Sequence, residues 1–360
     1  MLAREVCMKC RRAVVDREND QRSLSGTLMA AAVKRYSVFP IGTPGVAWGE
    51  AEKAAWRAQQ VKQRDYFRDV VSALHRLGAG GSEGPAVPVD VEQYGELDYR
   101  RFGAARYPLF AAKSAPWDPA KPMVAITGGV HGYESSGIHG ALTFLRRYMA
   151  GSAALGVNVL VLPCVSPWGY EMIHRWTPEA VDPNRQFKPD AAPGCDEARF
   201  AMACIAAHVA KSQSLLLHMD LHETTDTDNT VFTPSRFARD GLTEDKFDAW
   251  YDIPDGFYVY GDSARPVDQL EFSNHLIAEV GKVTHIAPAD ADGKIVGEKV
   301  AAPGVLLAPG EGTADAHTKA RFVTTTEVYP DSARTNPEEC NVAQATAVKA
   351  GIEYVVAHRE

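Results

Sequence analysis

A histidine and a glutamate stand three residues apart in a glycine-rich segment, GGVHGYESSG, at residues 128–137. An apolar run, MVAI, precedes this segment, and apolar residues at helical spacing follow it. A plain loop between a strand and a helix uses glycines, but it does not need His131 or Glu134. A short turn that leads into a helix can bring both side chains to one ion, and its glycines let the backbone pass close by. His131 and Glu134 are therefore candidate metal ligands.

A third candidate ligand, His222, lies at the end of another apolar run, SLLLHMDLH, at residues 214–222. Two histidines and one carboxylate that leave a fourth position open form a common catalytic zinc set. The open position holds the water that is activated. We expect one Zn²⁺ per chain, bound by His131, Glu134 and His222. The alternative is that these are ordinary polar residues at strand ends.

Other histidines are also candidates: His139, His174, His208, His218, His285 and His317. His218 shares a predicted strand face with His222, but the two positions lie about 13 Å apart in an extended strand, so they are poor partners for one ion. The segment HETTD at residues 222–226 is not an HExxH motif, because its fifth residue is Asp226.

Further residues carry the chemistry that hydrolysis beside a carboxylate requires. The segment SPWGYEMIHRWTPEAVDPNRQF, at residues 166–187, contains Arg175 and the pair Asn184 and Arg185. Arginine is suited to a substrate carboxylate because its planar guanidinium can bind both oxygens. Glu327 stands in a run of Thr and Val, where a carboxylate is costly to bury unless it is paired or used. Next to a zinc-bound water Glu327 would be a general base; otherwise it is a glutamate on a solvated strand face.

The elements that must position these residues alternate between strands and helices. Apolar runs predict strands at 123–129, 157–163, 214–222, 256–262 and 321–330, and helices are expected near 138–149, 196–211 and 341–360. Such alternation predicts an α/β fold, a three-layer α/β/α sandwich around a mixed, mostly parallel central sheet. In these folds ligand sites collect where strands end and loops begin. The candidate residues fall at such positions.

The first 85 residues are predicted to form an N-terminal extension, followed by one catalytic domain at residues 86–360. An amphipathic helix is expected at 50–77, with Phe67, Val70, Val71 and Leu74 on one stripe. A glycine-rich linker at 78–85 follows it. Near the start, Cys7 and Cys10 form a CxxC that could be half of a zinc site, but no second CxxC follows, so a disordered tail is the preferred interpretation.

The composition is typical of a globular protein, with 45% hydrophobic and 23% charged residues. The net charge of −8 argues against a nucleic-acid partner, which usually binds a basic surface. No apolar run approaches the roughly 20 residues of a membrane span. The charged N-terminus also lacks the apolar centre of a secretory signal. We therefore expect no membrane partner and a cytoplasmic location, where the six cysteines would stay reduced.

Taken in order, these motifs resemble the zinc metallocarboxypeptidase family M14. GVHGYE and DLH are similar to the segments that carry the family's metal ligands, and TTTEVYP is similar to the one with its catalytic glutamate. SPWGYE is similar to its Asn-Pro-x-Gly-Tyr-Glu loop, with Ser166 in place of Asn, and DPNR matches its Asn–Arg pair. The resemblance runs from about residue 120 to the C-terminus.

The resemblance implies a role for each matching residue. Asn184 and Arg185 would bind the free carboxylate of the substrate. Arg175 would polarise the scissile carbonyl, and Glu327 would be the catalytic base. A metallocarboxypeptidase-like fold would surround them.

The family's peptidases also use a mobile tyrosine near the substrate carboxylate. Tyr258 or Tyr260 could fill that place, and Tyr251 is an equal candidate. Asp220 and Asp182 are the expected supports of the metal site, because a ligating histidine usually donates its other N–H to a carboxylate. For Asp182 a plain turn residue before a proline is the alternative.

The implied activity is zinc-dependent hydrolysis of the amide bond next to the free C-terminal carboxylate of a peptide. DPNR and DLHETT are also similar to the DLNR and DLHNTT patterns of aspartoacylases and succinylglutamate desuccinylases, which cleave small N-acyl amino acids. Pro183 and Glu223 depart from those patterns, and Glu223 could be a substrate contact or a supporting carboxylate. The expected partner is thus a peptide or an N-acyl amino acid with a free carboxylate. The remaining alternative is a non-catalytic carboxylate-binding protein.

Overall fold

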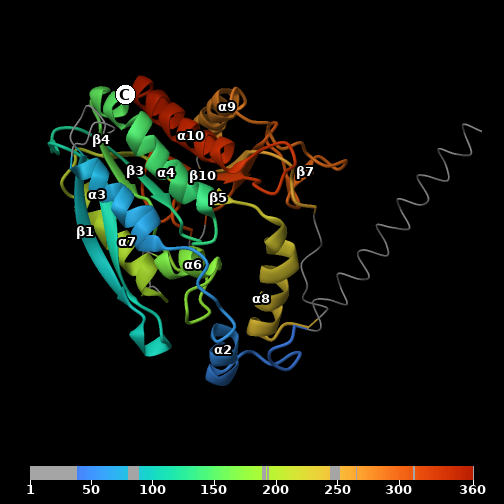
Figure 1. Ribbon diagram of the computed structural model, residues 1–360. Coiled ribbons are helices and arrows are strands. Elements are labelled where there is room, and N and C mark those ends of the chain that lie inside the picture. The colour runs from blue at the N-terminus through green and yellow to red at the C-terminus, as the bar shows by residue number, and fades with distance from the viewer. Residues whose placement is uncertain are drawn as a thin grey trace, which may run out of the picture. The chain divides into compact units, whose positions relative to one another are not determined.

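The computed structural model describes residues 39–79, 89–188, 192, 194–243, 252–264, 266–310 and 313–359 (Figure 1). The CxxC at Cys7 and Cys10, most of the predicted linker and Tyr251 lie outside these ranges. Within them, no helix has the length and apolar character needed to cross a lipid bilayer.

The chain separates into two compact units, one with Met1–Ala58 and Thr227–Tyr251, the other with Gln59–Asp226 and Asp252–Glu360. The first unit contains helix α2 (Glu50–Arg57), a π-helical turn (Asp228–Phe232) and helix α8 (Thr233–Asp240). The second unit contains the sheet, the remaining helices and every candidate site residue within the described ranges.

The second unit is built on an eight-stranded sheet with the order β1-β2-β4-β3-β5-β10-β6-β9. Its strands are β1 (Val89–Asp98), β2 (Arg106–Ser114), β3 (Met123–Gly128), β4 (Asn158–Leu162), β5 (Leu215–Glu223), β6 (Tyr258–Asp262), β9 (Val305–Ala308) and β10 (Phe322–Val328). The four central strands β4, β3, β5 and β10 are mutually parallel, whereas β1, β2 and β6 join through antiparallel pairs. A two-stranded ribbon of β7 (Lys294–Ile295) and β8 (Glu298–Lys299) stands apart.

Helices cover both faces of this sheet. They are α3 (Ser72–Gly78), α4 (Ser135–Arg147), α5 (Met149–Ala154), α6 (Pro167–Met172), α7 (Asp196–Val209), α9 (Pro266–Val280) and α10 (Pro337–Ala357). The helices α4 and α10 pack against β5 and against each other (Figure 1). On the opposite face, α7 packs in one apolar cluster with β3 and β4. The predicted α/β/α architecture with a mixed, mostly parallel sheet is thus confirmed.

Alternation along β5 decides which residues face which layer, because successive side chains of a strand point to opposite faces. Gly351 of α10 lies against Leu217 and Met219. The even-numbered residues of the strand, among them Asp220 and His222, therefore face the α7 side. The strand is buried along almost its whole length, so both faces are covered.

The helix predicted at 50–77 is wrong in its extent. The structure has α2, then a non-helical stretch, then a π-helical turn (Phe67–Val71) that continues into α3. Residues 59–65 lack the apolar stripe of the flanking turns. The backbone N–H groups of Gln63 and Arg64 bond instead to the carbonyl oxygen of Glu171, far along the chain. Strands β1 and β2 were not predicted, because the polar residues of VDVEQYGELD hide the alternation of an edge hairpin.

The first turn of α7 buries a carboxyl group, Glu197, which is 0% exposed. Its Oε1 atom accepts a hydrogen bond from the hydroxyl of Tyr99 at 2.5 Å. Its Oε2 atom has no hydrogen-bond partner among the described residues. Burial raises the pKa of Glu197 to about 7. The folded protein therefore holds a proton here that the unfolded chain releases near its ordinary pKa.

We expect Glu197→Gln to stabilise the protein at pH 8 but not at pH 4. Because the folded-state pKa is raised, stability falls as the pH rises from the ordinary value of Glu through about 7. The difference corresponds to about 3 kcal/mol at pH 8, since each pKa unit is worth about 1.4 kcal/mol. Urea unfolding of both proteins across this pH range measures it. Parallel stability curves would contradict the assignment.

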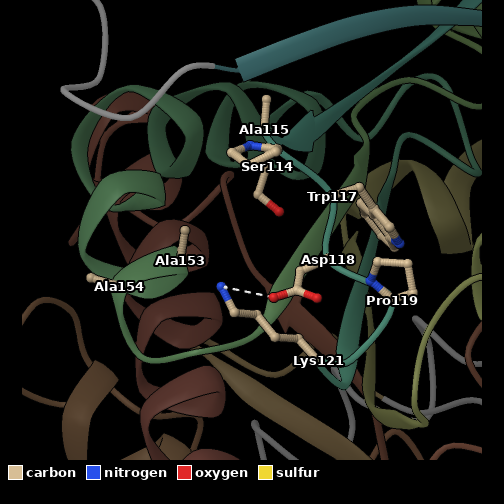
Figure 2. A pocket seen from close by; sticks show the side chains of 9 residues that line it. Ser114, Ala115, Trp117, Asp118, Pro119, Lys121, Ala153 and Ala154 are labelled. Atoms are coloured by element: carbon tan, nitrogen blue, oxygen red, sulfur yellow. Dashed lines mark ion pairs between the residues drawn. The ribbon is translucent and has the colours of Figure 1, made fainter.

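A cavity of about 340 Å³ opens beside the loop that follows β2, lined by residues that include Ser114, Trp117 and Lys121 (Figure 2). Lys121 forms an ion pair with Asp118 there, at 3.7 Å. The Ser114 hydroxyl oxygen accepts a hydrogen bond from the backbone N–H of Val159, at the start of β4. The cavity thus lies at the amino ends of the parallel strands, opposite the carboxyl ends where the candidate ligands stand.

Candidate metal centre

The loop after β3 and the end of β5 meet at the carboxyl edge of the sheet. Gly128, the last residue of β3, is in register with Leu221, so the loop starts beside His222. The loop leads into α4, and Glu134 occupies the N-cap position, although its side chain bonds to the cluster and not to the helix backbone. A Cβ atom added to Gly137 in the first turn of α4 would lie 2.3 Å from the carbonyl oxygen of Leu221. Only glycine allows the helix to approach β5 this closely.

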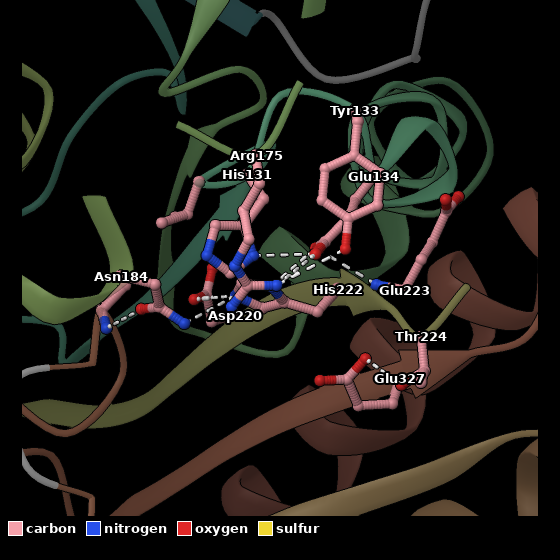
Figure 3. Close-up of polar contacts among 12 residues, drawn as sticks. His131, Tyr133, Glu134, Arg175, Asn184, Asp220, His222, Glu223, Thr224 and Glu327 are labelled. Carbon is pink, nitrogen blue, oxygen red and sulfur yellow. Dashed lines mark hydrogen bonds and ion pairs between the residues drawn. The ribbon is translucent and has the colours of Figure 1, made fainter. Parts of the chain in front are cut away.

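The structure brings His131, Glu134 and His222 together in one buried cluster (Figure 3). Nδ1 of His131 lies 2.7 Å from Oε1 of Glu134. Nδ1 of His222 lies 2.6 Å from Oε2 of the same carboxylate. All candidate ligand atoms are within 4.8 Å of one another, so the three side chains could hold a metal ion.

Each histidine of the cluster also contacts a second carboxylate through its other nitrogen. Nε2 of His131 lies 2.9 Å from Oδ1 of Asp182, and Nε2 of His222 lies 2.6 Å from Oδ2 of Asp220. Metal-bound histidines typically donate their outer N–H in this way, which fixes the tautomer. Both rings therefore present Nδ1 to the centre of the cluster. Asp182 is also a turn residue, since it accepts a hydrogen bond from the backbone of Asn184.

The electrostatics of the cluster favour a cation. Burial opposes ionisation of Glu134, but His222 and His131 outweigh it and lower the pKa of this carboxyl group. Burial likewise opposes the charged form of His222, yet Asp220 and Glu134 raise the pKa of its imidazole well above the usual range. The carboxylates of Glu134, Asp182 and Asp220 surround the two imidazoles, and the guanidinium of Arg175 lies beside them. A divalent cation would take the place of the proton on His222, because an imidazole that binds a metal is neutral.

Arg175 lies at the side of the cluster. Its Nε atom donates a hydrogen bond to Oδ2 of Asp182 at 3.0 Å. One terminal nitrogen lies 3.5 Å from the hydroxyl of Tyr133 and 3.9 Å from Oε1 of Glu134. The Arg175 side chain is 19% exposed, so it is partly accessible to solvent.

Glu327 stands directly beside a candidate ligand. On β10 it is the register partner of His222 in the parallel strand β5. Adjacent strands lie about 4.8 Å apart, and paired side chains point to the same face. The Oε2 atom of Glu327 accepts a hydrogen bond from the hydroxyl of Thr224 at 3.0 Å. Glu327 is half-buried, which leaves part of it accessible beside the cluster.

The residues expected on the substrate carboxylate differ in how the structure places them. Asn184 is buried, and its amide oxygen accepts a hydrogen bond from the backbone of Ala314 at 2.9 Å. Its amide nitrogen lies 3.3 Å from Nε2 of His222. Arg185 is exposed, and its guanidinium donates to the carbonyl oxygen of Asn184. Asn184 is thus part of the packing around His222, whereas Arg185 is at the surface.

Tyr258, predicted as the tyrosine that covers the substrate, is buried within the sheet. It is 1% exposed on β6, where it is the register partner of Glu327. Its hydroxyl lies 2.6 Å from Oγ1 of Thr224, which in turn bonds to Glu327. The sequence could not reveal this, because strand pairing decides the burial. Tyr260 is half-buried on the same strand.

Glu223 lies on the face opposite to His222. Its Oε1 atom accepts a hydrogen bond from the backbone N–H of Ser136, in the first turn of α4, at 2.5 Å. Its own backbone N–H donates to Oε2 of Glu134 at 3.2 Å. Of the two alternatives for this residue, the structure favours a supporting carboxylate that ties the start of α4 to β5.

A second group of metal-ligand types, Glu92, Cys204 and His208, lies between β1 and α7. Lys113 forms an ion pair with the carboxylate of Glu92, so the ammonium group of the lysine already balances the negative charge of this carboxylate. Nδ1 of His208 lies 2.9 Å from the carbonyl oxygen of Cys204, one helical turn earlier. We assign no metal to this group.

Comparisons with known proteins agree with the fold. Residues 114–258 match a family of proteins of unknown function, DUF2817. No curated protein sequence matches the chain. Among solved structures, a "putative metallopeptidase" from Shewanella amazonensis SB2B superposes with a TM-score of 0.58 at 21% identity, covering 82% of this chain and 99% of that one.

Two further structures extend the comparison. A "putative metallopeptidase" from Shewanella denitrificans OS217 has a TM-score of 0.56 at 19% identity, with 81% and 89% of the two chains covered. The carboxypeptidase A from Helicoverpa armigera has a TM-score of 0.50 at 14% identity, with 95% and 81% covered. At these identities the likeness concerns the fold, which is similar to that of metallopeptidases and carboxypeptidases.

Proposed function

We propose that this protein is a zinc-dependent hydrolase that cleaves the amide bond next to the free C-terminal carboxylate of a peptide. One observation supports the proposal above the others. His131 and His222 direct Nδ1 at the two oxygens of Glu134, while a separate carboxylate contacts each Nε2 atom. In a metal site, each histidine directs one ring nitrogen at the metal and donates the N–H of the other to a carboxylate. A buried ion-pair network does not require this arrangement.

At such a site zinc would supply a Lewis acid and lower the pKa of a bound water. The donor set of two imidazoles and one carboxylate suits zinc. Glu327 then accepts a proton from the attacking water and returns it to the leaving amine. Its position beside His222, with Thr224 bonded to one carboxylate oxygen, supports this role. Through Thr224, Tyr258 orients the base rather than contacting the substrate.

The arginines give the proposed site its substrate preference. Arg175 is close enough to the cluster to stabilise the oxyanion of the tetrahedral intermediate, a contribution often worth about 3 kcal/mol. Arg185 is exposed one residue beyond Asn184 and binds the free carboxylate. Asn184 supports the position of Arg185, since its own side-chain amide is hydrogen-bonded within the protein.

The product spectrum tests the proposal. Zinc-loaded protein is incubated with a mixed peptide pool and with a panel of N-acyl amino acids, and products are identified by mass spectrometry. Loss of single C-terminal residues supports the carboxypeptidase, and the residues lost define its preference. Cleavage of N-acyl amino acids alone would support the deacylase alternative instead. Zinc binding without cleavage of either panel would favour the carboxylate-binding alternative.

Asp220→Asn should weaken zinc binding by about 10- to 100-fold, the usual cost of losing an outer partner of a metal-bound histidine. The amide retains the shape but removes the charge that faces Nε2 of His222. Competition with a chromophoric chelator measures the affinity. The matched control is Asp268→Asn, on the exposed face of α9. Equal affinities of both variants would contradict the role of Asp220.

We also propose that the second compact unit carries the catalytic activity. The sequence places residues 1–85 in an extension outside the catalytic domain. Yet Gln59 begins the unit that contains the cluster, so the described residues 59–79 of this extension are grouped with it.

A further inference from the structure

We propose that Arg64 is a positioning residue for the metal-binding loop, supplied by a stretch of chain that precedes the carboxypeptidase-like part of the sequence. The proposal rests on the function proposed above, because it concerns the geometry of the same site. Arg64 contacts neither a candidate ligand side chain nor the reacting groups. It acts through the backbone between two ligands.

The stretch around Arg64 is fastened to one residue, Glu171, at the end of α6. The backbone N–H groups of Gln63 and Arg64 both donate to the carbonyl oxygen of Glu171, at 2.7 and 3.2 Å. The Oε1 atom of Glu171 accepts a hydrogen bond from the backbone of Tyr66 at 3.1 Å and forms an ion pair with Lys62 at 2.7 Å. Glu171 is 2% exposed, so these contacts are largely shielded from water. They hold the Arg64 backbone in place.

From this position the Arg64 side chain reaches the metal-binding loop. Its Nη1 atom donates a hydrogen bond to the carbonyl oxygen of Tyr133 at 3.0 Å. Its guanidinium also lies over the ring of Tyr170, 5.2 Å from the centroid. Tyr133 stands between the candidate ligands, one residue before Glu134 and two after His131. The Arg64 contact therefore fixes the peptide group that leads directly into Glu134.

The other end of the same loop is held from α6. Ser166, which precedes α6, donates its hydroxyl proton to the carbonyl oxygen of Val130 at 2.7 Å. Two residues further along the loop, a Cβ atom added to Gly132 would lie 2.1 Å from the backbone nitrogen of Tyr170, so the loop packs directly against α6. Ser166 thus holds the loop at Val130, and Arg64 holds it at Tyr133. Loss of the Arg64 side chain removes the contact with the Tyr133 carbonyl.

Loss of the Arg64 contact should change the geometry of the metal ligands more than the stability of the fold. Binding sites lose affinity when the elements that support the ligands allow displacements of about 1 Å. The backbone hydrogen bonds to Glu171 do not depend on the Arg64 side chain, so the stretch itself should stay docked in a variant. Removal of an outer support of a ligand typically costs 10- to 100-fold in metal affinity. We expect Arg64→Ala to fall in this range.

The test compares wild type with Arg64→Ala, Arg64→Lys and the control Arg76→Ala, which removes an exposed arginine of α3. Zinc affinity is measured by chelator competition, and the ligand geometry by the visible absorption of the Co²⁺-loaded proteins. We expect Arg64→Ala to lose 10- to 100-fold in zinc affinity and to alter the cobalt spectrum. Arg64→Lys should recover part of the affinity, because an ammonium group can still donate to the Tyr133 carbonyl. Arg76→Ala should match wild type.

Wild-type affinity and an unchanged cobalt spectrum in both Arg64 variants would overturn the positioning role. A wild-type protein that binds neither zinc nor cobalt would instead overturn the proposed function, so the two failures are distinguishable. If Arg64→Ala is too unstable to load, Arg64→Met takes its place, because methionine keeps most of the side-chain length but has no N–H to donate to the Tyr133 carbonyl. Weaker zinc binding and a shifted cobalt spectrum in Arg64→Met support the proposal, and wild-type values refute it.

Discussion

Glu327→Gln is expected to lower kcat by at least about 100-fold, and by as much as about 10⁴-fold, with zinc affinity unchanged. Glutamine has nearly the same shape, and its amide oxygen can still accept the hydrogen bond from Thr224. An amide cannot accept a proton from water at neutral pH, so the general base is lost. Steady-state kinetics on the substrate found by mass spectrometry measure kcat, and chelator competition measures the affinity for zinc.

The matched control for this variant is Glu338→Gln on α10, where the carboxylate is 62% exposed and pairs with Arg147. It should retain wild-type kinetics. A Glu327→Gln protein with full activity would exclude Glu327 as the base. A variant that loses zinc together with activity would instead identify this residue as a ligand or a structural element of the site.

Zinc should stabilise the wild-type protein, and His222→Ala should abolish that stabilisation. A ligand that binds only the folded state adds about 4 kcal/mol when its free concentration is 1,000 times Kd. The substitution also leaves Asp220 and Glu134 without their shared partner, which destabilises the metal-free protein. The relevant quantity is therefore the change in unfolding free energy on addition of zinc, measured separately for each protein.

The control for this experiment is His358→Ala, which removes an exposed histidine near the C-terminus. Its zinc-dependent stabilisation should equal that of wild type, and a chelator should reverse it in both proteins. An undiminished effect of zinc in His222→Ala would show that the ion binds elsewhere. The group formed by Glu92, Cys204 and His208 would then be the next candidate.

The central strands of the sheet could be predicted because they are buried on both faces. MVAI is wholly apolar and LLLHMDLH is apolar at five of its eight positions, a richness that is typical of parallel strands between two helical layers. The edge hairpin of β1 and β2 and the broken helix before it were not predictable in the same way. The broken helix depends on a partner far along the chain, Glu171, and the polar residues of β1 leave only a weak alternation in the sequence.

By itself, the sequence determined which residue types stand at the carboxyl ends of the buried strands: His131 and Glu134 after β3, His222 at the end of β5, and Glu327 near the end of β10. Each of these residues lies within or shortly after a run of strand-forming residues, so its position can be recognised from the local sequence. The parallel topology then brings these strand ends to one edge of the sheet.

Only the tertiary structure decided what surrounds those residues. Register paired Glu327 with His222 and buried Tyr258 beside Glu327, and the packing of α4 on β5 brought the backbone N–H of Ser136 to Glu223. The same is true of Arg64, whose contact with the Tyr133 carbonyl joins residues 69 positions apart. Such contacts depend on long-range packing, in which a shift of one residue reverses every side chain of a strand. A local sequence pattern contains no information on that register.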